Sequence, residues 1–298
     1  MKRQIFAASA LVVAACLPAP AAAVPGPAPA LSAWHSRSDA AFAAARKSGK
    51  PVLVDLYAAW CGWCKTMERE VFSQARFQTY AERFELLRVD VEDGADGSEL
   101  QQRFRADSLP TLLLLDPKQA LIGKIEGFME TERLIARLDR ELKAYDAFLA
   151  AYESALASTD PVLWRSRGQE MHARGDGGRA AVLFERVLHG GSLSGDELAW
   201  TRLQLADAYR IDGRFAEAKR TASDLRRALA GAAPTAQSPG IAERVDLLLI
   251  FIAGGEGDCT GAAGALAAFE RGHPQSPYLA DARRAYSALK SDTTAQCS

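Results

Sequence analysis

The chain has almost no net charge, only five cysteines, and no second long apolar run beyond its first residues. It carries 36 lysines and arginines against 37 aspartates and glutamates, which gives a formal net charge of −1. Nucleic-acid binding needs a basic surface, so this balance argues against a nucleic-acid partner. With 48% hydrophobic and 24% charged residues over 298 positions, the composition predicts two globular domains of ordinary size.

The first 23 residues have the pattern of a cleaved secretory signal. Lys2 and Arg3 precede an apolar run over 5–17, which is shorter than the roughly 20 residues that a membrane-spanning helix needs. We therefore predict a signal peptide over residues 1–23 and a periplasmic protein that is soluble after cleavage. The alternative is a lipoprotein anchored through Cys16, because the residues before this cysteine resemble a lipobox.

Composition divides the rest of the chain into further segments. A proline- and alanine-rich stretch predicts a tether over 24–32, and apolar runs alternating with helical spacings predict an α/β domain over 33–150. Alanine and leucine at helical spacing predict an all-α domain over 160–290, followed by a tail over 291–298. In the α/β domain, strands are expected near 51–57, 84–91, 112–115 and 121–125, and helices near 38–49, 61–73, 77–83, 98–105 and from 131 onward.

The all-α region resembles tetratricopeptide repeats. Gly175, Gly213 and Gly257 each separate two stretches with helical spacing of small and apolar residues. We predict helical hairpins, with residues 230–240 as an inserted loop. The spacing between the units is irregular, so an α-helical bundle unrelated to these repeats is the alternative.

Cys61 and Cys64 lie between a predicted strand and a predicted helix. A helix N-terminus directs free N–H groups and a partial positive charge at the first sulfur, which favours the thiolate. We therefore expect Cys61 to be the attacking and more exposed sulfur, and Cys64 to resolve the mixed disulfide. This interpretation predicts a redox-active disulfide without a metal or a cofactor.

Two structural interpretations compete with redox chemistry. A zinc site usually needs a second ligand pair at short spacing, which Cys259 and Cys297 do not supply. A purely structural disulfide across two residues would constrain the unfolded chain very little. Cys259 and Cys297 are expected either to form a structural disulfide with each other or to be two free thiols, and the four scattered histidines are expected at the surface.

The segment from Asp55 onward resembles the active-site segment of the thioredoxin superfamily. The likeness covers about 33–145 and rests on Trp-Cys-x-x-Cys-Lys, on Asp55 six positions before Cys61, and on Leu-Pro-Thr at 109–111. It is similar in particular to the periplasmic thioredoxin-like branch that includes the C-terminal domain of the transmembrane thiol:disulfide interchange reductase. The resemblance implies an α/β thioredoxin fold with a central mixed sheet flanked by helices, followed here by the all-α helical-hairpin domain.

The same resemblance assigns a role to Asp55. A carboxyl inside an apolar strand should be buried, and burial raises its pKa. In the family the matching acid helps to move the proton of the second cysteine, so Asp55 is the candidate base for Cys64. The alternative is a buried carboxyl that is satisfied by hydrogen bonds and is chemically inert.

The resemblance also implies a set of substrate-binding residues: Trp60, Gly62, Trp63, Leu109 and Pro110. Pro110 matches the family's cis-proline, which faces the sulfurs and leaves the Leu109 backbone free to pair with an extended client. Trp60 is expected to be a lid beside the sulfurs, with core packing as the alternative. Trp63 replaces the usual proline between the cysteines, so the resemblance does not transfer a direction of electron flow, and reductase, isomerase and oxidase remain open.

These expectations combine into two hypotheses about function. The first is an exported thiol:disulfide oxidoreductase that acts on protein disulfides, with a helical region that recruits a partner or client. Because the compartment is oxidising, a reductase there needs a membrane-embedded electron donor, which the family implies. The second is a partner-binding scaffold in which the tetratricopeptide-like region dominates and the thioredoxin domain only presents a partner.

Overall fold

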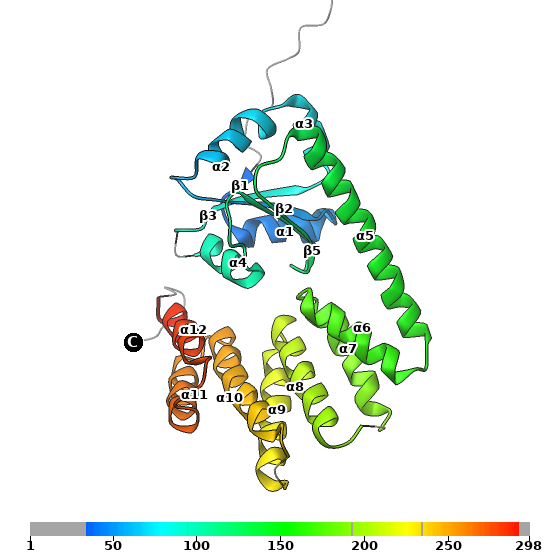
Figure 1. Ribbon diagram of the computed structural model, residues 1–298, viewed down its shortest axis with the longest axis vertical. Helices are drawn as coiled ribbons and strands as arrows, with labels where there is room; N and C mark the ends of the chain where they lie inside the picture. The colour runs from blue at the N-terminus through cyan, green and yellow to red at the C-terminus, as the bar shows by residue number, and fades with distance from the viewer. Residues whose placement is uncertain (1–33, 94, 192, 234, 292–298) are drawn as a thin grey trace, which may run out of the picture.

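The computed structural model describes residues 34–93, 95–191, 193–233 and 235–291 of the chain. Its N-terminal part is built on a five-stranded sheet (Figure 1). The strands are β1 (Trp34–His35), β2 (Val52–Tyr57), β3 (Glu85–Asp90), β4 (Thr111–Leu115) and β5 (Leu121–Glu126), in the spatial order β1-β3-β2-β4-β5. β3 runs parallel to β2, whereas β4 runs antiparallel to both β2 and β5. The mixed sheet confirms the predicted fold class.

Helices cover both faces of this sheet (Figure 1). One face carries α1 (Ser38–Ser48) and α4 (Asp96–Phe104), and the other carries α2 (Gly62–Met67), α3 (Ala75–Ala81) and α5 (Thr131–Ala157). The single helix expected over 61–73 is instead α2 followed by a π-helical turn, η2 (Glu68–Phe72). α5 is far longer than the expected closing helix needs to be, because no glycine or proline interrupts its 27 residues.

The side chains of the central strand β2 contribute alternately to two hydrophobic cores, one on each face of the sheet. Successive side chains of a strand point to opposite faces. Val52, Val54 and Leu56 join the core under α1 and α4, whereas Leu53 joins the core under α2, α3 and α5. Asp55 has the same parity as Leu53, so its carboxyl lies on the face that carries α2 and the two cysteines.

The described residues after α5 form an array of antiparallel helices, named here the helical array. Its members are α6 (Pro161–Ala173), α7 (Gly177–His189), α8 (Gly195–Ile211), α9 (Phe215–Gly231), α10 (Ser238–Gly255), α11 (Cys259–Gly272) and α12 (Leu279–Ser291). Gly175, Gly213 and Gly257 occupy the predicted turns with φ of 77°, 76° and 69°, a conformation that glycine adopts without strain. The expected loop over 230–240 is shorter, because α9 continues to Gly231 and a proline in the first turn of α10 favours an early start.

The long helix α5 belongs to both parts of the molecule. Its N-terminal half places Leu134 and Leu138 in the core beneath the sheet, and its C-terminal half places Tyr152 and Ala155 in the core of the helical array. Residue 150, where we expect the thioredoxin-like domain to end, lies inside this helix. The division into 33–150 and 160–290 therefore stays a prediction.

Arg174, in the turn between α6 and α7, joins the helical array to the β4–β5 hairpin. The carbonyl oxygen of Arg174 accepts a hydrogen bond from the Leu121 amide at 2.7 Å. Its guanidinium donates to the carbonyl oxygens of Leu121 and Ile122 at 2.9 and 3.2 Å and stacks 4.4 Å from the ring centre of Phe148. The array thus lies on the α1 and α4 side of the sheet (Figure 1). Among the described helices, none is both long enough and apolar enough to span a bilayer.

Candidate active site

Cys61 and Cys64 are joined by a disulfide at the start of α2. Cys61 is the N-cap residue of this helix, and its Sγ accepts a hydrogen bond from the Cys64 amide at 3.0 Å. Cys61 is 4% exposed and Cys64 is 2% exposed, so the first sulfur has only a small advantage in access. The helix N-terminus favours a thiolate on Cys61 when the disulfide is open.

Three segments that are distant in sequence meet at the disulfide. Ala58 precedes it in the chain, Val91 follows β3, and Leu109 precedes β4, and all three pack with the two cysteines. The peptide bond between Leu109 and Pro110 is cis, as the resemblance implies. The structure therefore brings the Leu109–Pro110 step to the cysteines, while its role in binding a substrate stays a prediction.

Asp55 is 1% exposed and lies on the face of the sheet that carries α2. Burial raises the pKa of Asp55 from 3.8 to about 7, against the lowering effect of Arg88 and with a smaller upward effect of Glu68. Arg88 Nε lies 3.3 Å from Asp55 Oδ2, yet the geometry is not that of a hydrogen bond, and neither carboxylate oxygen has a hydrogen-bond partner among the described residues. A carboxyl that titrates near neutrality without such partners is suited to proton transfer.

Arg88 and Glu68 are site residues that the sequence analysis missed. Arg88 pairs in register with Asp55 across β2 and β3, donates to Glu68 Oε2 at 2.7 Å, and lies 4.5 Å from the ring centre of Tyr57. In η2 the Ser73 amide donates to the Glu68 carbonyl oxygen five residues earlier, the signature of a π-turn. The sequence signal that could have identified Arg88 is that it is the one basic residue in the predicted strand at 84–91.

Two tryptophans flank the first cysteine at the surface. Trp60 is 67% exposed and Trp63 is 61% exposed, which excludes the alternative that Trp60 packs in the core. Trp60 Nε1 donates to Glu92 Oε1 at 2.8 Å, and the Trp63 ring lies 5.5 Å from the ring centre of Phe128. Gly62 is exposed, and a Cβ added there would meet no atom within 4 Å, so the surface beside the disulfide is open.

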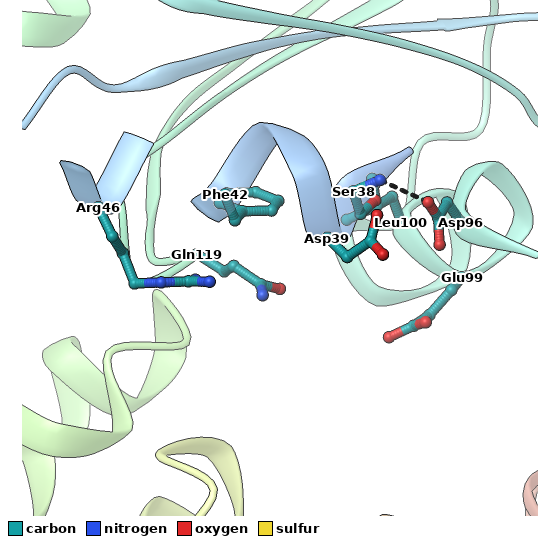
Figure 2. A pocket seen from close by; sticks show the side chains of 8 residues that line it. All are labelled: Ser38, Asp39, Phe42, Arg46, Asp96, Glu99, Leu100 and Gln119. Carbon is teal, nitrogen blue, oxygen red and sulfur yellow. Dashed lines mark hydrogen bonds between the residues drawn. The ribbon is translucent and has the colours of Figure 1, made fainter. Parts of the chain in front are cut away.

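A separate cavity of about 280 Å³ lies between α1 and α4. Figure 2 shows Arg46 and Gln119 at one end and three carboxylates at the other. One of these, Asp96, accepts a hydrogen bond from the Ser38 amide at 2.5 Å and thereby caps α1. No cysteine lines the cavity, so it is not part of the disulfide site. Its lining residues are Ser38, Asp39, Phe42, Arg46, Asp96, Glu99, Leu100 and Gln119.

Three of the four histidines are partly buried beside a carboxylate, and one of them, His35, has its Nε2 3.5 Å from Glu85 Oε2. His172 Nε2 lies 2.8 Å from Asp207 Oδ2, and His273 Nε2 lies 3.0 Å from Asp246 Oδ2. Burial acts to raise the pKa of Asp207, but hydrogen bonds from His172 and Arg210 prevail and lower it to about 2. Within the described residues, no group of three or more histidine, cysteine or acidic side chains is arranged to hold a metal ion.

The three remaining cysteines are Cys16, Cys259 and Cys297. Cys259 is the first residue of α11, far along the chain from Cys61. Cys16 and Cys297 lie outside the described residues. Both the Cys259–Cys297 bridge and lipidation of Cys16 therefore stay predictions.

Comparisons with known proteins place residues 33–117 in a family described as thioredoxin-like. DsbD of Ralstonia nicotianae, a thiol:disulfide interchange protein, is 39% identical over 110 residues, which cover 36% of this chain and 18% of the relative. DsbD of Pseudomonas fluorescens is 42% identical over 94 residues, which cover 29% and 16%.

A solved structure was also matched, the oxidised C-terminal domain of Neisseria meningitidis DsbD. It is 20% identical, covers 37% of this chain and 99% of that domain, and has a TM-score of 0.32. The chain spans less than a fifth of the length of the two DsbD sequences that it matches. The chain therefore contains a thioredoxin-like domain over residues 33–117, homologous to a part of the DsbD proteins.

Proposed function

We propose that the protein is an exported thiol:disulfide oxidoreductase that exchanges its Cys61–Cys64 pair with protein disulfides. The observation that carries this proposal is a disulfide at the N-terminus of α2, on the same face of the sheet as a buried carboxyl whose pKa is raised to about 7. Homology to proteins named thiol:disulfide interchange proteins supports the same chemistry. Export rests on the predicted signal peptide over 1–23.

In the first step the Cys61 thiolate attacks one sulfur of a client disulfide. The client S–S bond breaks, a bond forms between Cys61 Sγ and that sulfur, and the second client sulfur leaves as a thiolate that takes up a proton. The open surface at Gly62 admits the client, and the Leu109 backbone is the proposed rest for an extended segment.

In the second step Cys64 resolves the mixed disulfide. Asp55 accepts the Cys64 thiol proton, and the resulting thiolate attacks Cys61 Sγ. The mixed S–S bond breaks, and the client sulfur leaves as a thiolate that takes up the proton from Asp55 or from water. Two electrons have then passed from the protein to the client, and the Cys61–Cys64 disulfide is restored. A membrane-embedded dithiol donor is the proposed source of electrons for the next cycle, and the opposite direction would use the same bonds in reverse.

The helical array is the proposed site of client or partner recruitment. Stacked helical hairpins of the tetratricopeptide type form extended surfaces for peptide segments. Arg174 fixes the first hairpin to the β4–β5 hairpin, so an array-bound client would be held at a set distance from the disulfide. In the scaffold alternative this recruitment would be the main function, and the disulfide would be secondary.

Dithiothreitol-driven reduction of insulin tests the proposed activity, with the full chain compared with a chain that ends at Ser158. We expect both to accelerate insulin precipitation within about threefold of each other, because the cysteines, Asp55 and Pro110 all precede the cut. Circular dichroism checks that the shorter chain is folded, since removal of the array exposes Tyr152 and Ala155. A full chain without any acceleration would contradict the oxidoreductase and favour the scaffold.

A further inference from the structure

Four large apolar side chains remain exposed among the described residues. They are Trp60, Trp63, Val162 and Val182. Two of these four lie within five consecutive residues that also contain both cysteines. Large apolar surface that is not buried within a chain commonly marks a binding site.

The Trp63 ring is held in place by Phe128. The two rings lie 5.5 Å apart at an interplanar angle of 35°, within the range of favourable aromatic pairs. Phe128 directly follows Gly127, whose amide donates to the Pro110 carbonyl oxygen at 2.8 Å. The aromatic pair is therefore tied to the same loop that carries the cis-proline beside the cysteines.

The other indole presents only apolar surface to a ligand. Tryptophan has a single hydrogen-bond donor and no acceptor, and the Trp60 donor is already bonded to Glu92 at 2.8 Å. What remains exposed of Trp60 is its ring. Gly62 lies between Trp60 and Trp63 in the sequence. A Cβ added to Gly62 would meet no atom within 4 Å. The disulfide is thus bordered by aromatic rings that are already oriented, and this lowers the entropic cost of binding.

We propose that Trp63 and Phe128 form a specificity-determining surface that selects protein disulfides flanked by an aromatic or aliphatic side chain. Such side chains lie next to a cystine and are accessible when the client is not yet folded, because a folded protein buries most of them. The inference rests on the proposed oxidoreductase function and names its substrate class. A small hydrophilic disulfide would gain nothing from this surface.

Two cystine peptides of equal length, ring size and net charge test the proposal. They differ only in the residue after one cysteine, which is phenylalanine in one peptide and serine in the other. The measured quantity is the ratio of their kcat/KM values for reduction by the reduced protein. Both peptides meet the same Cys61, so the ratio cancels any change in the reactivity of the sulfur itself.

We expect the wild-type protein to prefer the phenylalanine peptide about tenfold, as one additional aromatic contact implies. Phe128→Ala should bring the ratio to within about twofold of one, and Trp63→Ala should do the same. Val162→Ala, which removes an equally exposed apolar side chain on α6, should keep the wild-type ratio.

A wild-type ratio near one, or an unchanged ratio in Phe128→Ala, would overturn the proposed surface while leaving the oxidoreductase intact. Failure of the wild-type protein to reduce either peptide is a different result. It would refute the proposed function itself, and the substrate class would fall with it.

Discussion

Replacement of Cys61 by serine should lower the catalysed rate of insulin reduction by about three orders of magnitude or more. A serine hydroxyl is not a nucleophile toward a disulfide sulfur at neutral pH, whereas a thiolate is. The substitution is nearly isosteric at a position that is 4% exposed, so the fold should persist. The measurement is dithiothreitol-driven insulin precipitation, corrected for the uncatalysed rate.

Cys64→Ser is the matched control for this prediction. It also removes turnover, but it keeps the attacking sulfur and loses only the resolving one. When the reduced Cys64→Ser variant is incubated with insulin, it should therefore accumulate a covalent adduct through Cys61. Mass spectrometry of samples without reductant would detect this adduct. Turnover that survives in Cys61→Ser would refute the assignment of the attacking sulfur, as would an adduct that forms through another cysteine.

Asp55→Asn should make the oxidised protein more stable at alkaline pH. The pKa of Asp55 rises from 3.8 in the unfolded chain to about 7 in the folded one, so the folded state binds the extra proton between these values. Wild-type stability therefore falls as the pH rises from about 4 to 7 and stays low above 7. A shift of about three units corresponds to about 4 kcal/mol at most, since each unit is worth 1.36 kcal/mol.

Urea denaturation of the oxidised protein at pH 4.5 and pH 8.5 measures this effect. The free energy of unfolding of Asp55→Asn, relative to wild type, should rise by about 3 kcal/mol between the two pH values. Glu68→Gln is the control, because it keeps the Asp55 carboxyl and removes the Glu68 charge, which raises the pKa of Asp55. It should move the wild-type transition to lower pH without removing it. A relative stability of Asp55→Asn that is independent of pH would show that Asp55 does not titrate near 7.

Local patterns were sufficient to predict the elements that position the cysteines. The apolar runs at 51–57 and 112–115 have no polar residue except Asp55, and such runs form the buried strands β2 and β4. Gly49 directly follows α1 with a φ of 75°, which is why the end of that helix could be predicted from the glycine alone.

The contacts that complete the site depend on the register between distant segments, which no local pattern contains. Arg88 meets Asp55 only because β3 pairs parallel with β2 in one register. Phe128 meets Trp63 only because the chain after β5 returns to the Pro110 loop. The role of Arg174 could not be predicted for the same reason. Its hydrogen bonds to Leu121 and Ile122 join residues that are more than 50 positions apart in the sequence.

A redox titration of the Cys61–Cys64 pair distinguishes a redox-active disulfide from a structural one. The native protein is equilibrated in dithiothreitol buffers of graded potential, quenched with an alkylating agent, and analysed by mass spectrometry for the modification of each cysteine. We expect one reversible two-electron transition in which Cys61 and Cys64 are modified together, and its midpoint would also give the direction of electron flow. A pair that stays oxidised in excess dithiothreitol until the protein is denatured would be a structural disulfide, and this result would refute the proposed thiol:disulfide exchange.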